Sequence, residues 1–137
     1  MASVRVHFVA LSLVLLIPHF TLAQQSSGSV CVASRADDPF WKEPMPSSGE
    51  INSHELRVKI DKRPAVAWPQ KKSLKIDALE ADERHLLVVL DSGGKAIESL
   101  WFRFSEYKST NLCMSYDGYQ GVQLHEDTRR TPWCKCK

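Results

Sequence analysis

The stretch His-Leu-Leu-Val-Val-Leu at residues 85–90 decides the fold, because no other run after the amino-terminal segment is as apolar. Asp-Ser-Gly-Gly follows at residues 91–94, and glycine supplies the positive φ angles of a tight hairpin turn without steric penalty. In the returning strand, Leu100, Phe102 and Phe104 are predicted to face inward. Trp101 and Arg103 are predicted to lie on the opposite face. This pattern predicts a central β-hairpin.

Shorter stretches on both sides of the hairpin alternate between apolar and polar residues, which is the period of a half-buried strand. Further strands are predicted at residues 55–60, 65–68, 74–76, 112–116 and 122–124. Residues 77–84 are mostly polar and are predicted to form a loop or a single helical turn. About seven short strands with glycine-bearing turns, and no helical periodicity of useful length, indicate an all-β sandwich or small barrel.

The amino-terminal segment, residues 1–23, has the three parts of a secretory signal peptide. Arg5 gives a basic start, residues 8–17 form the apolar run, and small residues precede a cleavage expected after Ala23. The alternative is a membrane anchor, which needs roughly 20 apolar residues, and Pro18 interrupts this run too early. We therefore expect a secreted or periplasmic protein with no membrane span in the mature chain.

The mature chain, from Gln24, has the length of one domain. Residues 24–54 are rich in serine, proline and glycine and lack periodicity, which predicts an irregular arm. Within this arm, Phe40 and Trp41 are expected to make the apolar contact with the domain. Residues 55–137 are predicted to form the β domain and its cysteine-containing tail.

Cysteine occurs four times, at Cys31, Cys113, Cys134 and Cys136, and an even number in an exported chain predicts a disulfide framework. A bridge between Cys134 and Cys136 would be strained, because only one residue separates them. Cys31 is therefore expected to pair with one of these two and Cys113 with the other, which ties the two ends of the chain together. The alternative is a soft-metal or redox pair at Cys134 and Cys136, but the nearest histidine, His125, is not at a standard zinc spacing.

Charge and motifs exclude several classes of function. The formal net charge is +2 and the basic residues are interleaved with acidic ones, so no nucleic-acid partner is expected. Nucleophile-elbow, phosphate-loop and zinc-protease motifs are absent, and no catalytic residue, cofactor or metal site is predicted. In a first acidic cluster, Asp82, Glu83 and His85, the histidine is interpreted as a strand-start residue that is hydrogen-bonded to a turn. A second cluster, residues 125–127, is interpreted as a solvated loop. For the first cluster, the alternative is a metal ion shared by Glu83 and His85.

Three aromatic side chains near strand ends and turns, Trp68, Trp101 and Tyr119, are candidates for a binding surface. Aromatic rings on one sheet face can stack on sugar rings or anchor a protein partner. The competing interpretation is that most of these rings pack within the sandwich, and that Trp101 covers a sheet edge or the arm.

A family resemblance adds to this fold prediction. The spacing Leu74-x-Ile76, Leu79, His85-x-Leu87-x-Val89, followed by a glycine turn and a further strand, resembles the PEGA-type modules of exported bacterial proteins. The resemblance covers about half of the mature chain, and it implies a small immunoglobulin-like module associated with cell-surface machinery. The chain departs from that pattern in its cysteine-rich tail and in lacking proline-glycine before the histidine. No catalytic residue is implied.

These observations predict an exported, non-catalytic binding domain with an immunoglobulin-like fold, for a cell-envelope glycan or a protein partner. The alternative is a disulfide-stapled secreted effector, inhibitor or signalling protein. A third class, a small hydrolase or metal-binding protein, is less favoured because no motif for either chemistry is present.

Overall fold

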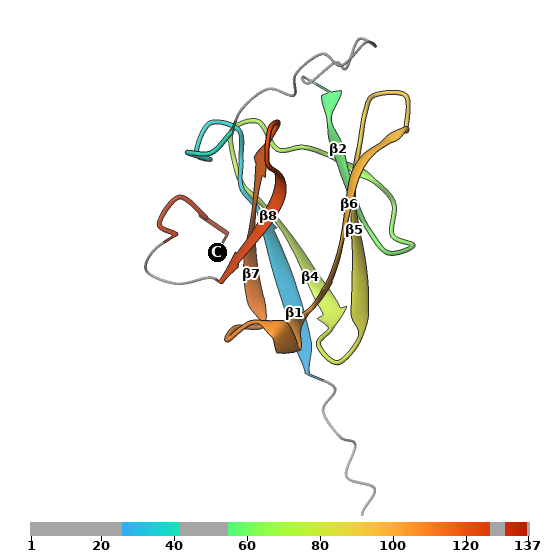
Figure 1. Ribbon diagram of the computed structural model, residues 1–137. Helices are drawn as coiled ribbons and strands as arrows, with labels where there is room; N and C mark the ends of the chain where they lie inside the picture. The colour runs from blue at the N-terminus through green and yellow to red at the C-terminus, as the bar shows by residue number, and fades with distance from the viewer. Residues whose placement is uncertain (1–25, 42–54, 127–130, 137) are drawn as a thin grey trace, which may run out of the picture.

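The computed structural model describes residues 26–41, 55–126 and 131–136. These residues form eight strands and one short 3₁₀ helix, η2 (Phe104–Glu106). The strands make two four-stranded sheets that face each other across an apolar core (Figure 1). The predicted signal peptide, residues 42–54 of the predicted arm and Asp127 lie outside the described residues.

The first sheet has the order β4-β1-β7-β8. Its strands are β1 (Ser27–Val32), β4 (Leu74–Glu80), β7 (Asn111–Asp117) and β8 (Gly121–Glu126). Strand β1 pairs antiparallel with β4 on one side and parallel with β7 on the other. Strands β7 and β8 form the predicted last hairpin. Because β1 is central, its backbone hydrogen bonds are satisfied on both edges.

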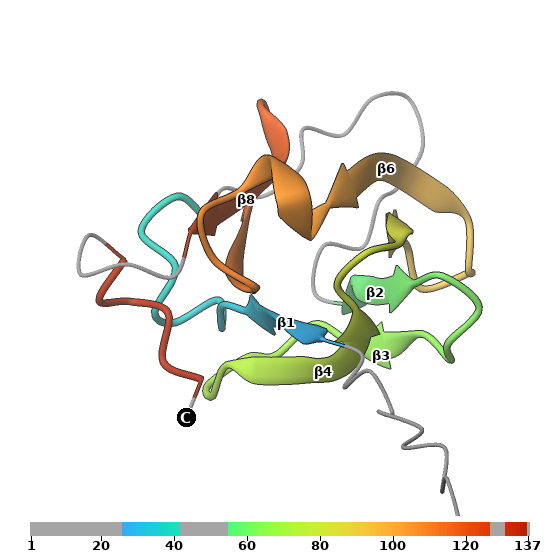
Figure 2. The ribbon, with the colours of Figure 1, turned by 90° about the horizontal axis from the view of Figure 1, so that it is seen from below.

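The second sheet has the order β3-β2-β5-β6. Its strands are β2 (Arg57–Ile60), β3 (Val66–Ala67), β5 (Arg84–Leu90) and β6 (Ala96–Arg103), and Figure 2 shows β3 beside β2. The hairpin predicted from residues 85–104 is confirmed as β5 and β6. Gly94 has a φ of 83° in the turn between them, which is the conformation that glycine adopts without strain.

The core lies between the two sheets and takes buried side chains from both. Its largest fully buried members are Trp68, Tyr116, Phe102, Leu56, Ile60, Leu79, Leu87, Leu112 and Met114. The inner faces of β5 and β6 contribute as their alternation predicts, with Leu87 and Phe102 inside and Trp101 outside. The all-β prediction is therefore confirmed, and the arrangement is a two-sheet sandwich.

The prediction that residues 24–54 are irregular was wrong for Ser27–Val32, which form strand β1. Residues 28–32 are buried on both faces of this strand, so its sequence does not alternate in polarity. Gly28 also makes the strand hard to predict, because glycine is uncommon within strands. A side-chain carbon at Gly28 would collide with the ring of Phe104, so the position tolerates only glycine. Residues 33–41 follow the prediction and consist of turns and irregular structure.

The loop predicted at residues 77–84 was also wrong in its first half, because β4 continues to Glu80. The strand is polar there because it lies at the edge of the first sheet, where only Leu79 faces the core. Ala78 adopts a φ of 54°, opposite the point where the register of β1 shifts. A local irregularity of this kind removes the regular alternation on which the sequence prediction depends.

Two disulfides join the extremities of the fold, as predicted, and the structure resolves the pairing that the sequence leaves open. Cys31 of β1 bridges Cys136, and Cys113 of β7 bridges Cys134. No free cysteine is present among the described residues. The thiolate pair considered for Cys134 and Cys136 is therefore wrong, because each sulfur belongs to a different disulfide.

Candidate functional site

Trp101 is the largest exposed side chain of the second sheet. It lies on the edge strand β6, is 51% exposed, and pairs directly with Leu86 of β5. The guanidinium carbon of Arg84 lies 4.5 Å from the centre of the indole ring, which is the geometry of a cation–π contact. One face of the indole is therefore covered by an arginine from the neighbouring strand.

The outer row of β5 is apolar, although it faces away from the core. His85, Leu87 and Val89 are buried inward, so Leu86, Val88 and Leu90 face outward, and all three remain partly exposed. An antiparallel sheet with one solvated face normally alternates apolar-in and polar-out. Aliphatic side chains on both faces are typical of a strand that is covered on both sides. This is the physical origin of the unbroken apolar run at residues 85–90.

The charged side chains on the same outer face are all basic. Strand register places Lys59 beside Val88 and Arg57 beside Leu90, and it pairs Arg84 with Arg103. We call this outer face the Trp101 surface and define it by Arg57, Lys59, Arg84, Leu86, Val88, Leu90, Trp101 and Arg103. It combines an apolar centre with a basic margin.

A groove of about 720 Å³ opens at one end of this surface. Leu86 and Trp101 line it together with five charged residues, Asp61, Lys62, Arg63, Glu83 and Arg84. Asp61 is fixed in position, because its carboxylate accepts the N–H of Leu86 at 2.8 Å and its other oxygen lies 2.7 Å from Nδ1 of His85. The groove thus has rigid walls on the β5 side.

His85 holds these walls together and is not placed to bind a metal. Its Nε2 lies 2.7 Å from the carbonyl oxygen of Glu80 and its Nδ1 faces Asp61, so both ring nitrogens are engaged. The ring is buried and packs against Phe102 and Phe104. The interpretation of His85 as a residue bonded to a turn is therefore confirmed. Within the described ranges, no group of three histidine, cysteine or acidic residues is placed to hold a metal ion.

The structure separates the three predicted surface aromatics. Trp68 is only 2% exposed and donates from Nε1 to the carbonyl of Ala33 at 3.2 Å, so its prediction as a surface residue was wrong. It follows β3 directly and turns into the core, where it packs on Trp41 and Tyr116. Tyr119 is 61% exposed in the turn between β7 and β8, and it does not line the groove at Trp101.

The two aromatic residues of the arm have different environments. Trp41 packs against the core cluster, as the prediction of an apolar contact requires. Phe40 is more exposed and stacks on His125, which also meets Trp133 edge-on. Burial lowers the pKa of His125, and Nε2 of this ring lies 2.8 Å from the hydroxyl of Ser115. This cluster closes the carboxyl-terminal tail over the first sheet. The solvated loop predicted at residues 125–127 was therefore wrong for His125 and Glu126, which belong to strand β8.

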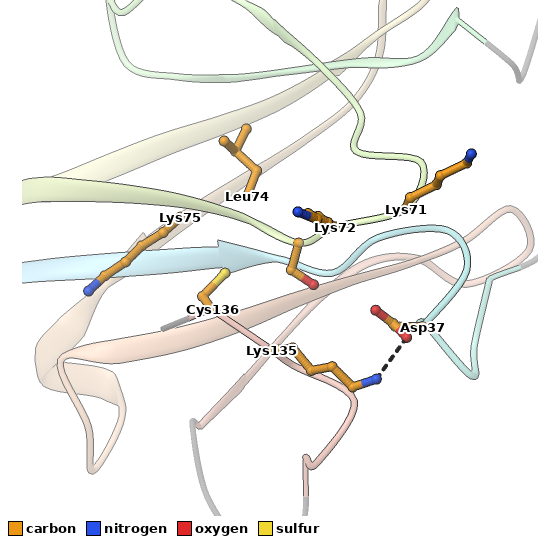
Figure 3. A pocket seen from close by; sticks show the side chains of 8 residues that line it. Asp37, Lys71, Lys72, Leu74, Lys75, Lys135 and Cys136 are labelled. Carbon is orange, nitrogen blue, oxygen red and sulfur yellow. Dashed lines mark hydrogen bonds and ion pairs between the residues drawn. The ribbon is translucent and has the colours of Figure 1, made fainter.

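A second groove, of about 570 Å³, lies where the tail meets the beginning of β4. Its lining residues include four lysines and one acidic residue: Lys71, Lys72, Lys75, Lys135 and Asp37. The ammonium of Lys135 contacts Asp37 at 3.0 Å (Figure 3). We call this the lysine groove. No sequence pattern indicates this groove, because its residues are far apart in the chain and the overall charge is close to balanced.

No protein-family model, curated protein sequence or solved structure matches this chain. The site must therefore be interpreted from its own geometry. Within the described ranges, no helix has both the length and the apolar character needed to cross a membrane.

Proposed function

We propose that this chain is an exported, non-catalytic binding domain that takes a protein partner on the Trp101 surface. The observation that carries the proposal is the apolar outer row of β5. Leu86, Val88 and Leu90 face outward on a central strand, next to an exposed tryptophan. Covering such a row with a partner stabilises the complex by about 25 cal/mol for each Å² of apolar surface removed from water.

The residue types at this surface favour a protein over a glycan. Tryptophan and arginine are the side chains that most often dominate protein–protein binding energy, and here Trp101 and Arg84 are already in contact. Arg84 covers one face of the indole, which leaves a single face on which a sugar ring could stack. The row from Leu86 to Leu90 also extends beyond the footprint of a single stacked ring.

The basic margin defines the partner further. Arg57, Lys59, Arg84 and Arg103 lie around the apolar row. Complementary charge across an interface speeds association and suppresses wrong partners. The expected partner therefore presents an apolar centre and an acidic margin.

Export is supported by two independent features. Residues 1–23 have the pattern of a cleavable signal peptide, and both disulfides are of the kind that persists in oxidising compartments. An immunoglobulin-like module fits the same setting and is supported by the two facing antiparallel-rich sheets.

The proposal is tested by capturing a partner with matched variants. The oxidised mature chain is immobilised and exposed to the extracellular fraction of the organism that makes it, and the retained protein is purified for measurement of Kd. Trp101→Ala should weaken binding at least tenfold, because truncating a central anchor costs more than about 1.4 kcal/mol. Tyr119→Ala is the control, since it removes an equally exposed ring outside the Trp101 surface.

Three results would contradict a protein partner at this surface. Equal binding by the wild type and Trp101→Ala would place the interface elsewhere. Retention on a polysaccharide array that Trp101→Ala abolishes would favour the glycan alternative. Concentration-dependent dimerisation that Trp101→Ala abolishes would show that a second copy of the chain covers the surface.

A further inference from the structure

We infer that the lysine groove binds a linear anionic polysaccharide, such as a chain of uronate or sulfated sugars. The groove belongs to the first sheet and the tail, so this inference does not rest on the Trp101 surface. It combines residues from three separate parts of the chain: the turn after β1, the segment leading into β4, and the tail at residues 135–136.

The positive charge in the groove is not neutralised by the protein. Asp37 is the only acidic residue that lines it among the described residues, and it is engaged by Lys135 at 3.0 Å. The pKa of Asp37 is lowered, mainly by this bond, so the carboxylate stays charged and offsets one lysine. Lys71, Lys72 and Lys75 make no ion pair with any described residue. The chain as a whole has a net charge of only +2, so three unmatched lysines at one groove are a local concentration of charge.

The arrangement of the lysines favours an extended ligand over a compact ion. Figure 3 shows Lys71, Lys72 and Lys75 pointing in different directions along the loop and β4, so that their ammonium groups do not converge on one point. A lysine ammonium acts as a point charge on a flexible stem, whereas arginine binds a single phosphate or carboxylate with two hydrogen bonds. Spaced point charges suit an anion whose own charges are spaced along a chain.

The remaining lining residues distinguish a polysaccharide from other polyanions. The side chains of low polarity in the lining are Leu74 and Cys136, and no aromatic ring is among the described residues there. Binding of a single-stranded nucleic acid relies on aromatic rings that stack on bases. An anionic membrane surface is typically bound by an amphipathic helix whose apolar face inserts among the lipids, whereas this groove is built from a turn, the beginning of β4 and the tail. The hydroxyl of Ser73 is an additional hydrogen-bonding group in the lining.

The disulfides hold this groove in shape. Lys135 lies between Cys134 and Cys136, which are bridged to two different neighbouring strands. The tail residue that contributes to the groove is therefore fixed from both sides. Two cysteines separated by one residue cannot easily form a disulfide with each other. Here each of them bridges a different strand, and the residue between them is held in place.

The test measures binding of the oxidised mature chain to heparin and to polygalacturonate by titration calorimetry at several salt concentrations. The triple variant Lys71→Gln, Lys72→Gln, Lys75→Gln should bind at least tenfold more weakly and lose most of the salt dependence, because fewer counterions are released. The control, Lys95→Gln, Lys108→Gln, removes two lysines that lie outside both the lysine groove and the Trp101 surface, and it should bind within about twofold of wild type.

A gain-of-affinity variant separates the groove from general charge effects. Asp37→Asn removes the only acidic side chain of the described lining and releases Lys135 from its ion pair, while keeping the shape of the residue. This variant should bind both polysaccharides severalfold more tightly than the wild type. Thermal melting of every variant verifies that the fold is retained.

Two outcomes would overturn the inference. Absence of binding to both polysaccharides, or an equal loss of affinity in the triple variant and its control, would show that the groove is not a site. Tighter binding to vesicles of equal parts phosphatidylcholine and phosphatidylserine, or to single-stranded DNA, would assign the groove to another polyanion. Loss of partner binding in Trp101→Ala with unchanged polysaccharide binding would keep the two proposals separate.

Discussion

The carboxylate of Asp38 accepts the backbone N–H of Tyr116 at 3.0 Å, and this bond joins the turn after β1 to strand β7. The other oxygen of Asp38 accepts the N–H of Phe40 at 2.8 Å. The side chain is buried, and this burial raises its pKa despite the two donors. Asp38 therefore fixes the path by which the arm returns toward the core.

Replacing Asp38 tests this connection. Asp38→Ala leaves two N–H groups without their acceptor, so the free energy of unfolding should fall by about 1–3 kcal/mol. Asp38→Asn keeps one acceptor oxygen and should cost less. Urea denaturation followed by tryptophan fluorescence measures both values, and equal costs for the two variants would contradict the role given to the hydrogen bonds.

Truncation of Trp68 and of Trp101 should lower the free energy of unfolding by very different amounts. Trp68→Ala empties a buried site that is surrounded by aromatic rings, and a loss of about 3–5 kcal/mol is expected. Trp101→Ala removes a largely exposed ring and one cation–π contact, and the loss should stay below about 1 kcal/mol. Denaturation of both variants under identical conditions decides the comparison. A similar loss in the two would mean that Trp101 is part of the core.

The two disulfides should contribute unequally to stability. The Cys31–Cys136 bridge spans 105 residues and the Cys113–Cys134 bridge spans 21. The chain-entropy model gives about 4.7 kcal/mol for closing the longer loop and about 3.4 kcal/mol for the shorter one. Serine pairs at each bridge, compared by chemical denaturation, should therefore show the larger loss for residues 31 and 136. The reverse order would contradict the loop-entropy account.

Stability should depend on pH through His125. Burial lowers the pKa of His125, so the unfolded chain binds this proton more readily than the folded chain. The contribution of the neutral His125 to the free energy of unfolding is therefore fully present above the ordinary histidine pKa of about 6.5. It is lost as the pH falls below that value toward the lower pKa that His125 has in the folded chain. His125→Gln should flatten the decrease between about pH 7 and pH 5. An unchanged slope in the variant would assign the decrease to other groups.

Strand periodicity predicted most of the fold, because β2 and β5 bury alternate side chains. Strand β7 was predicted from the alternation of large apolar residues with Cys113 and Ser115, although both of its faces are buried. Periodicity failed for β1, where five of the six residues are buried and where Gly28 lies against the ring of Phe104. It also failed at the end of β4, where an edge strand carries few apolar residues. Both failures concern properties set by neighbouring strands, which a local sequence window does not contain.

The candidate site was predicted only in part. Trp101 could be placed outside because it alternates with Leu100 and Phe102, but the same reasoning did not show that Trp68 turns into the core. The apolar run of β5 predicts a central strand. It does not show that the outer side chains of this strand are left uncovered. The lysine groove depends on the disulfide pairing, which four cysteines alone leave open.

Hydroxyl-radical footprinting of Trp101, in the chain alone and in complex with its captured protein partner, tests the central claim most directly. The account predicts that Trp101 is oxidised readily in the chain alone and is protected in the complex, while Tyr119 is oxidised to the same extent in both. Trp68 should stay unoxidised throughout because it is buried. Equal oxidation of Trp101 in both states, with protection of other residues, would contradict a binding surface on the outer face of β5 and β6.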